Sequence, residues 1–264
     1  RFTKRGCCCA LRGFPLAEPP AFWLYEEGIG EDRALLIERG QAALMRIERH
    51  GALRVGDVVE AKLVRVLGRG RAVAVDEAGR EYLADKLPRE ASEGSRLALQ
   101  VRRVAFAERG RYKWPLVRPT DAMPGRGPSL AERIAADRLP VERVHMGMQD
   151  RLAEYGWHEL VEAARSGEWA FAGGMLTISP TPAMTLIDVD GDGAPRMLAL
   201  AAAPEVARAI HLFGLSGSIG IDFPTLEAKA DRNAVAEAFD AAMALPCERT
   251  GVNGFGFMQV VTRR

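Results

Sequence analysis

Thr177-Ile-Ser-Pro-Thr-Pro-Ala-Met-Thr-Leu-Ile-Asp188-Val-Asp190-Gly-Asp192-Gly193 is the stretch that decides the fold of this 264-residue chain. Its apolar segment, residues 183–189, predicts a strand that runs into three acidic residues at alternate positions. Because alternate residues of a strand share one face, Asp188 and Asp190 should project together from the end of the strand. A β-turn explains Asp192 and Gly193. It does not explain Asp188, because a carboxylate without a partner is costly inside an apolar strand.

A second segment, Ser218-Ile-Gly-Ile-Asp222-Phe223, repeats this construction after a crossover of helical length. Mg²⁺ prefers oxygen ligands, and proteins bind it with one or two carboxylates plus substrate phosphates. The sequence therefore predicts a metal-dependent phosphodiester site built on Asp188 and Asp222. The alternative for Asp222 is a helix N-cap, although residues 224–225 supply that cap better.

The stretch from Asp188 to Gly193 also matches the opening of an EF-hand calcium loop. The twelfth position of that loop requires a bidentate Glu, and this chain has Ala199 there. A strand rather than a helix precedes the loop, so calcium binding of this kind is excluded.

The composition indicates a globular protein, with 48% hydrophobic and 27% charged residues and a net charge of +1. No run approaches the roughly 18 apolar residues of a membrane-spanning helix, so we expect no membrane partner and a cytoplasmic location. Three adjacent cysteines, residues 7–9, and the isolated Cys247 suit neither a zinc site nor a disulfide framework. Residues 1–20 are interpreted as a disordered leader, or as sequence upstream of the natural start.

The first half of the chain predicts two groups of short strands. Residues 22–49 indicate three strands with turns at Gly28, Gly30 and Gly40. Short alternating strands within residues 51–118 suggest a small closed barrel, the class to which OB-folds belong. The strands expected in the barrel are residues 58–67, 71–76, 81–84 and 97–106.

The second half predicts a mixed α/β sheet after a linker. Residues 115–128 are rich in Pro and Gly, which is typical of a linker. Ser129 is the expected N-cap of the next helix, with Glu132 completing a capping box. Strands follow around Met175 and Leu186 and at residues 219–221 and 257–262. The expected helices are residues 130–138, 149–166, 204–213 and 226–244.

Cations and aromatic residues alternate near the end of the barrel, a combination suited to single-stranded nucleic acid. The alternative is a barrel edge with solvated charges and a few core aromatics. The cluster comprises Arg102, Arg103, Arg109, Arg111, Lys113, Phe106, Tyr112 and Trp114. Lys62 on a barrel strand is a further candidate for RNA contact. Lys229 and Arg232 either face phosphates or form an ordinary solvated helix face.

Several segments resemble the ribonuclease E/G family. Residues 171–190 are similar to its catalytic segment, in which a Gly-Gly strand leads into Ile-Asp-Val-Asn, and residues 215–223 to its second metal segment. Residues 254–264 are similar to its Phe-Gly-Leu-(Leu/Met)-Glu-Met-Thr-Arg ending, and residues 53–67 to the start of its RNA-binding barrel. The resemblance covers residues 22–264.

The resemblance implies RNase H-like N-terminal strands with an inserted OB-fold barrel, followed by a mixed α/β catalytic subdomain. Residues 21–50 would pack with the catalytic part, 51–118 would form the barrel, 119–170 a linker with helices, and 171–264 the catalytic subdomain. The family's zinc-binding Cys-Pro-x-Cys has no counterpart, so no zinc is expected. The segment available for 5′-end sensing is also short. A homodimer is implied.

By resemblance, Asp188 and Asp222 hold Mg²⁺, which Mn²⁺ can replace, and the chain is an endoribonuclease that cleaves single-stranded RNA. Asp190 stands where the family has Asn, so it adds a charge and is either a further ligand or the mark of a site that has drifted. One alternative is a non-catalytic RNA-binding protein that retains the scaffold. Another is a plain α/β protein whose aspartates are structural.

Overall fold

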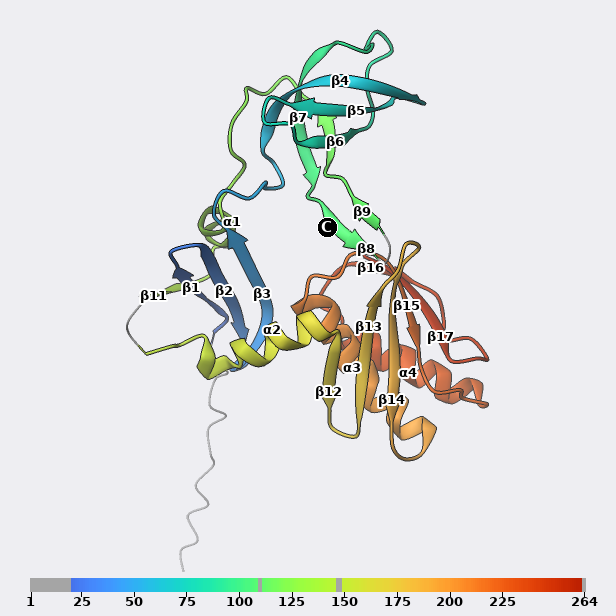
Figure 1. Cartoon of the computed structure of the whole chain (residues 1–264). Helices are drawn as coiled ribbons and strands as arrows, with labels where there is room; N and C mark the ends of the chain where they lie inside the picture. Colours follow the sequence, from blue (N-terminus) through green and yellow to red (C-terminus); the bar gives the residue numbers. More distant parts are fainter. Residues whose placement is uncertain (1–19, 109–110, 146–148, 263–264) are drawn as a thin grey trace, which may run out of the picture.

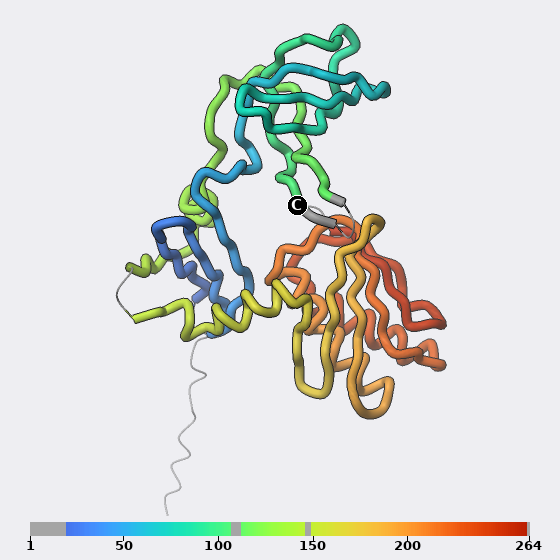
Figure 2. The backbone as a smooth tube through the Cα atoms, viewed as in Figure 1, coloured from blue at the N-terminus to red at the C-terminus, as the bar shows by residue number. Residues whose placement is uncertain are grey.

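The computed structural model describes residues 20–108, 111–145 and 149–262, so nearly all of the predicted leader lies outside the described residues. Figure 1 shows a barrel at the top, an N-terminal sheet at lower left and a C-terminal sheet at lower right. The backbone in Figure 2 leaves the N-terminal sheet, forms the barrel and then returns. The chain is a mixed α+β structure with four α-helices in its described part. None of the helices described is long and apolar enough to cross a membrane.

The N-terminal sheet has the order β11-β1-β2-β3, in which β11 runs parallel to β1 and the other neighbours are antiparallel. Apolar side chains on both faces of the sheet are buried, which explains the continuous apolar run Phe22-Trp-Leu-Tyr. Trp23 packs toward α1 (Leu130–Ala136), while Leu24 packs toward α2 (Trp157–Ser166). The strands are β1 (Phe22–Glu27), β2 (Glu31–Glu38), β3 (Gln41–Arg49) and β11 (Val141–Val144).

The five-stranded barrel closes in the order β10-β6-β5-β4-β7. Its interior holds alanines and branched aliphatic side chains around buried Tyr82, whose hydroxyl donates to the Asp76 carboxylate at 2.7 Å. A two-stranded hairpin, β8 (Phe106–Glu108) and β9 (Arg111–Lys113), precedes the last strand. The barrel strands are β4 (Val58–Gly68), β5 (Arg71–Asp76), β6 (Glu81–Ala84), β7 (Arg96–Arg103) and β10 (Leu116–Pro119).

Two expectations for this region are wrong. The expected strand over residues 97–106 ends at Arg103, and Phe106 begins β8 instead. Residues 115–128 are not simply a linker, because residues 116–119 form β10, which pairs with β6 and β7 and closes the barrel. The prolines that suggested a linker flank the buried Val117, where a missing N–H donor is tolerated at a strand end.

The helices between the barrel and the C-terminal sheet are shorter than predicted, and one of them is divided. Helix α1 (Leu130–Ala136) has the predicted capping box, with Ser129 Oγ accepting from Glu132 N at 3.2 Å and Glu132 Oε2 accepting from Ser129 N at 2.7 Å. The helix expected over residues 149–166 is divided into η1 (Ala153–Tyr155) and α2 (Trp157–Ser166). Gly156 between them has a φ of 78°, which interrupts the helical path.

The C-terminal sheet has the order β12-β13-β14-β15-β17-β16, with α3 and α4 packed against one face. Its only parallel neighbours are β14 and β15 among the described pairs. The elements are β12 (Glu168–Phe171), β13 (Gly174–Pro180), β14 (Thr185–Gly191), α3 (Pro195–Leu212), β15 (Gly217–Asp222), α4 (Lys229–Ala242), β16 (Cys247–Arg249) and β17 (Phe257–Thr262).

Both helices of this unit begin elsewhere than predicted. Helix α3 starts at Pro195, not at Pro204, which lies inside it. Burial of the apolar side of α3, including Leu198 and Val206, offsets the cost of an internal proline. Helix α4 starts at Lys229, three residues after the expected Leu226, whose side chain is buried in the core.

Candidate active site

The structure brings Asp188 and Asp222 together as direct neighbours on parallel strands. In the pairing of β14 with β15, Asp188 is the partner of Asp222. Thr177 of β13 lies beside Asp188, and Phe257 of β17 lies beside Asp222, so four residues form a row across the sheet. Asp190 shares the face of Asp188 because it is two residues further along the same strand.

The face that carries these carboxylates is the open face of the sheet. The alternate residues Ile187, Val189 and Ile221 point the other way and are buried in the core with α3 and α4. Asp188 and Asp222 are exposed, as is Asp190. The alternation predicted from the sequence thus places the acids on the side that the helices leave uncovered. Asp222 ends β15, whereas Asp188 lies in the middle of β14, which continues to Gly191.

The carboxylates repel one another. Partial burial raises the pKa of Asp188, and the negative charges of Asp190 and Asp222 raise it further, while the Val189 N–H opposes this shift. None of these three acids forms an ion pair with a cationic side chain of the described residues. A cation bound between them would offset this repulsion.

The donor set fits Mg²⁺ better than a softer metal, because it consists of carboxylate oxygens alone. Within the described residues, no three or more His, Cys, Asp or Glu side chains are grouped as a metal-enclosing cluster. An ion that retains several waters and needs only one or two carboxylates does not require such a cluster. Asp192 is exposed and lies beside Gly193, whose φ of 107° belongs to a turn, as predicted.

The cations in the first turns of α3 and α4 have different surroundings. Arg232 donates to the carbonyl oxygens of Leu226 at 2.7 Å and Glu227 at 2.6 Å, and so holds the segment that precedes α4. Lys229 at the start of α4 is exposed. Arg196, which the sequence analysis did not select, donates to Asp231 at 2.8 Å and connects the first turns of α3 and α4.

The predicted RNA-binding cluster lies on the barrel and its hairpin, not on β14 and β15, the strands that carry the aspartates (Figure 1). The Arg103 guanidinium lies 5.1 Å, and the Lys113 ammonium 5.0 Å, from the centre of the Phe106 ring. Tyr112 is 65% exposed and lines two hollows of about 830 and 450 Å³. Lys62 is exposed on β4. Arg109 lies outside the described residues, and for Arg111 only the backbone, in β9, is described.

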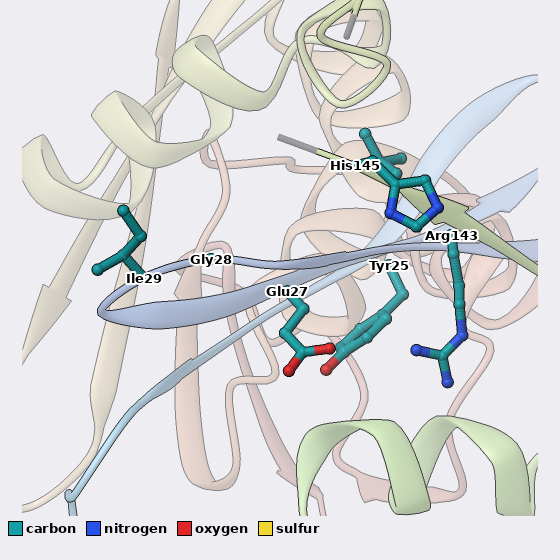
Figure 3. Close-up of a pocket in the computed structure, with 7 residues that line it drawn as sticks. Tyr25, Glu27, Gly28, Ile29, Arg143 and His145 are labelled. Carbon is teal, nitrogen blue, oxygen red and sulfur yellow. The ribbon is translucent and has the colours of Figure 1, made fainter. Parts of the chain in front are cut away.

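A further pocket, of about 350 Å³, lies at the carboxyl ends of the parallel strands β1 and β11 and contains none of the predicted site residues. Figure 3 shows Tyr25 and Glu27 of β1 opposite Arg143 and His145 of the β11 segment. This pocket and the aspartate row both lie at the end of a parallel strand pair. They differ in charge, because the pocket holds an acid and a base, Glu27 and Arg143, whereas the charged side chains of the row are both acidic.

Sequence reasoning missed the apolar residues next to the aspartates. Gly220, two residues before Asp222, lies beneath the side chains of Met184, Leu186 and Phe257. The available signal was the glycine itself, because a glycine inside an apolar strand often marks a close approach of other atoms.

Carboxylates that face each other on neighbouring strands, are open to solvent and form no ion pair within the described residues are the kind of site at which hydrolases bind a catalytic divalent cation. The chain belongs to the ribonuclease E/G family: the model of the family described as "Ribonuclease E/G family" matches residues 129–264. These residues include all three aspartates and the whole C-terminal sheet, while the barrel precedes them. A search of curated proteins finds no match. Membership suggests a ribonuclease that uses a divalent metal and acts on RNA.

Proposed function

We propose that this chain is a Mg²⁺-dependent endoribonuclease that cleaves single-stranded RNA. The observation that carries the proposal is the direct pairing of Asp188 with Asp222 on the open sheet face of a ribonuclease E/G family member. Two neighbouring carboxylates that form no ion pair within the described part of the chain have a physical reason to bind a cation, and a phosphodiester substrate supplies further oxygen ligands.

Asp188 and Asp222 would hold the metal, and Mn²⁺ could replace Mg²⁺ there. When bound, such a cation lowers the pKa of a coordinated water and neutralises charge on the scissile phosphate. Asp190 lies on the same face and raises the pKa of Asp188, so it acts on the site through charge whether or not it contacts the metal. Asp190 would either orient a water at the site or add a further ligand.

The barrel is proposed as the RNA-holding part, with an OB-like fold inserted into an RNase H-like N-terminal unit. Its closed five-stranded order and the aromatic and cationic side chains around Tyr112 support this role. Flat aromatic rings bind unpaired bases, and cations bind the phosphates between them. The proposed phosphate contacts are Arg103, Arg109, Arg111, Lys113, Lys62, Lys229 and Arg232. A homodimer and a cytoplasmic location complete the proposal.

Incubation of the purified chain with an unstructured RNA tests this function. Wild-type protein should cleave the RNA in Mg²⁺ and in Mn²⁺ and should stop when EDTA is added. The double variant Asp188→Asn, Asp222→Asn should be folded and inactive. Equal cleavage by both proteins would overturn the assignment.

The same assay separates the alternatives. RNA that is retained on a gel but never cleaved in either metal would select a non-catalytic RNA-binding protein. Electrostatic binding is strongest at low salt. If the RNA is not retained even there, the chain is neither an endoribonuclease nor an RNA-binding protein.

A further inference from the structure

Three apolar side chains converge on the open face of the C-terminal sheet. A Cβ atom placed on Gly220 would lie 2.6 Å from Phe257 Cζ, 2.9 Å from Met184 Sδ and 3.0 Å from Leu186 Cδ2. Any side chain at this position would therefore displace them. We call Met184, Leu186 and Phe257 the apolar shelf.

The apolar shelf adjoins the aspartates. Leu186 is the cross-strand partner of Gly220, and Asp188 is the partner of Asp222. The second pair lies two residues further along both strands and therefore on the same face of the sheet. That step is about 6.6 Å, two residues of an extended strand. Phe257 is the cross-strand partner of Asp222, while its ring tip reaches back over Gly220. The shelf and the carboxylates are thus neighbouring parts of one surface.

The apolar shelf is also accessible. Leu186 is 38% exposed, and Met184 and Phe257 are half-buried, whereas α3 and α4 cover only the opposite face. Apolar surface next to unpaired carboxylates suits a ligand that is flat and apolar in one part and ionic in the next. A nucleotide has this character, because its base is a flat ring and its phosphate would share a cation with the carboxylates.

We propose that the apolar shelf binds the base of the nucleotide adjacent to the scissile phosphate, with that base stacked on Phe257. The inference deepens the proposed function and rests on it. Because every base has a flat π-face, the shelf would accept any base in a single strand. A base-paired strand could not stack in this way, since its base faces are already covered. Phe257 thereby acts as a substrate-positioning residue.

Substitutions at Phe257 provide the first test. Phe257→Ala should lower kcat/KM on single-stranded RNA about tenfold, as expected for loss of one stacked base. Phe257→Leu, which keeps apolar volume but lacks the ring, should fall between Phe257→Ala and wild type. The matched control is Val261→Ala, since Val261 lies on the same face of the same strand, four residues further on, and is 37% exposed. It should retain wild-type kcat/KM.

An abasic substrate series distinguishes stacking from a folding defect. Single-stranded oligonucleotides, each with one abasic position, are tested against wild type and Phe257→Ala. One position beside the cleaved bond should reduce wild-type kcat/KM about tenfold while hardly affecting Phe257→Ala. Independent, multiplicative losses at every position would overturn the proposal.

The series also separates this proposal from the proposed function. If wild-type protein cleaves no RNA, the proposed function fails, and the same series is then read as dissociation constants from fluorescence anisotropy. Coupling between Phe257 and one abasic position in binding would still support the shelf. Absence of coupling in binding as well would reject it.

Discussion

The parallel pairs β1–β11 and β14–β15 both end at the surface, but the acids near their carboxyl ends are partnered differently. At β1, buried Glu26 pairs with Arg33 at 2.6 Å. Asp32 opposite accepts from the Tyr25 hydroxyl at 3.1 Å and lies 2.8 Å from His50 Nε2. At β14–β15 the acids are exposed and form no ion pair with the described residues.

The difference shows which acids maintain the fold and which are available for chemistry. A buried carboxylate must be paired or hydrogen-bonded, so Glu26 and Asp32 are fixed by their partners. Within the described residues, the carboxylates at β14–β15 have no cationic side chain as a partner, and their repulsion contributes to the raised pKa of Asp188. Both groups of acids lie near the end of a parallel strand pair, so their position does not separate them. Their hydrogen-bond and ion-pair partners do.

The largest expected effect is the loss of cleavage when an acid of the open row is neutralised. Asp188→Asn or Asp222→Asn should each reduce the cleavage rate about 10³-fold, because metal binding contributes several kcal/mol to catalysis. The melting temperature should not fall, since neither acid forms an ion pair with any residue that the structure describes. Asp192→Asn is the control, because Asp192 is an exposed turn residue. An equal loss in that variant would contradict the specific role of the row.

The opposite result is expected at the partnered acid Asp32. Asp32→Ala should lower the free energy of unfolding by about 2 kcal/mol, because Tyr25 and His50 lose a hydrogen-bond partner. Urea denaturation measures this change, and cleavage per folded molecule should stay constant. The neighbouring Glu31→Ala should cost under about 0.5 kcal/mol, since the Glu31 side chain is 41% exposed and its ion pair with the solvated Arg49 is long, at 3.8 Å. Comparable losses in the two variants would contradict the assignment of Asp32.

The contact between His50 and Asp32 should make the stability of the fold depend on pH. The hydrogen bond to Asp32 raises the pKa of His50. A raised folded-state pKa means that the folded chain binds the proton more tightly. This stabilisation is therefore complete below about pH 6.5 and is lost as pH rises through the raised pKa. The difference in unfolding free energy between wild type and His50→Gln should shrink as pH rises above about 6.5. A difference that grows with pH would contradict a stabilising bond between protonated His50 and Asp32.

The smallest expected effect is at Asp190. Asp190→Asn should change the cleavage rate by less than about threefold, since the amide keeps an oxygen in place while removing one repelling charge. The pKa of Asp188 should fall, because Asp190 contributes to raising it. Steady-state cleavage rates decide the matter, and a loss as large as that of Asp188→Asn would make Asp190 an essential ligand.

The aspartate row could be predicted from sequence because two simple periodicities determine it. Strand alternation places Asp188 and Asp190 on one face, and a helical crossover returns the chain parallel to its start, so Asp222 ends at the same edge. The capping box of Ser129 and Glu132 was equally local and is confirmed.

Long-range packing explains what the sequence did not reveal. The strand β10 was concealed by its flanking prolines, and only pairing with β6 and β7 makes it a strand. Helix α3 continues through Pro204 because its apolar side is buried. The apolar shelf depends on Phe257 reaching Gly220 from a strand 37 positions later, a contact that no local pattern encodes.

Metal occupancy is the most direct measure of the central claim that Asp188 and Asp222 form a divalent cation site. Electron paramagnetic resonance of Mn²⁺ titrated into the chain, with and without single-stranded RNA, counts bound ions. Wild type should bind one Mn²⁺ per chain more tightly when RNA is present, and Asp222→Asn should lose that ion. Equal Mn²⁺ binding by the wild type and Asp222→Asn would contradict the account.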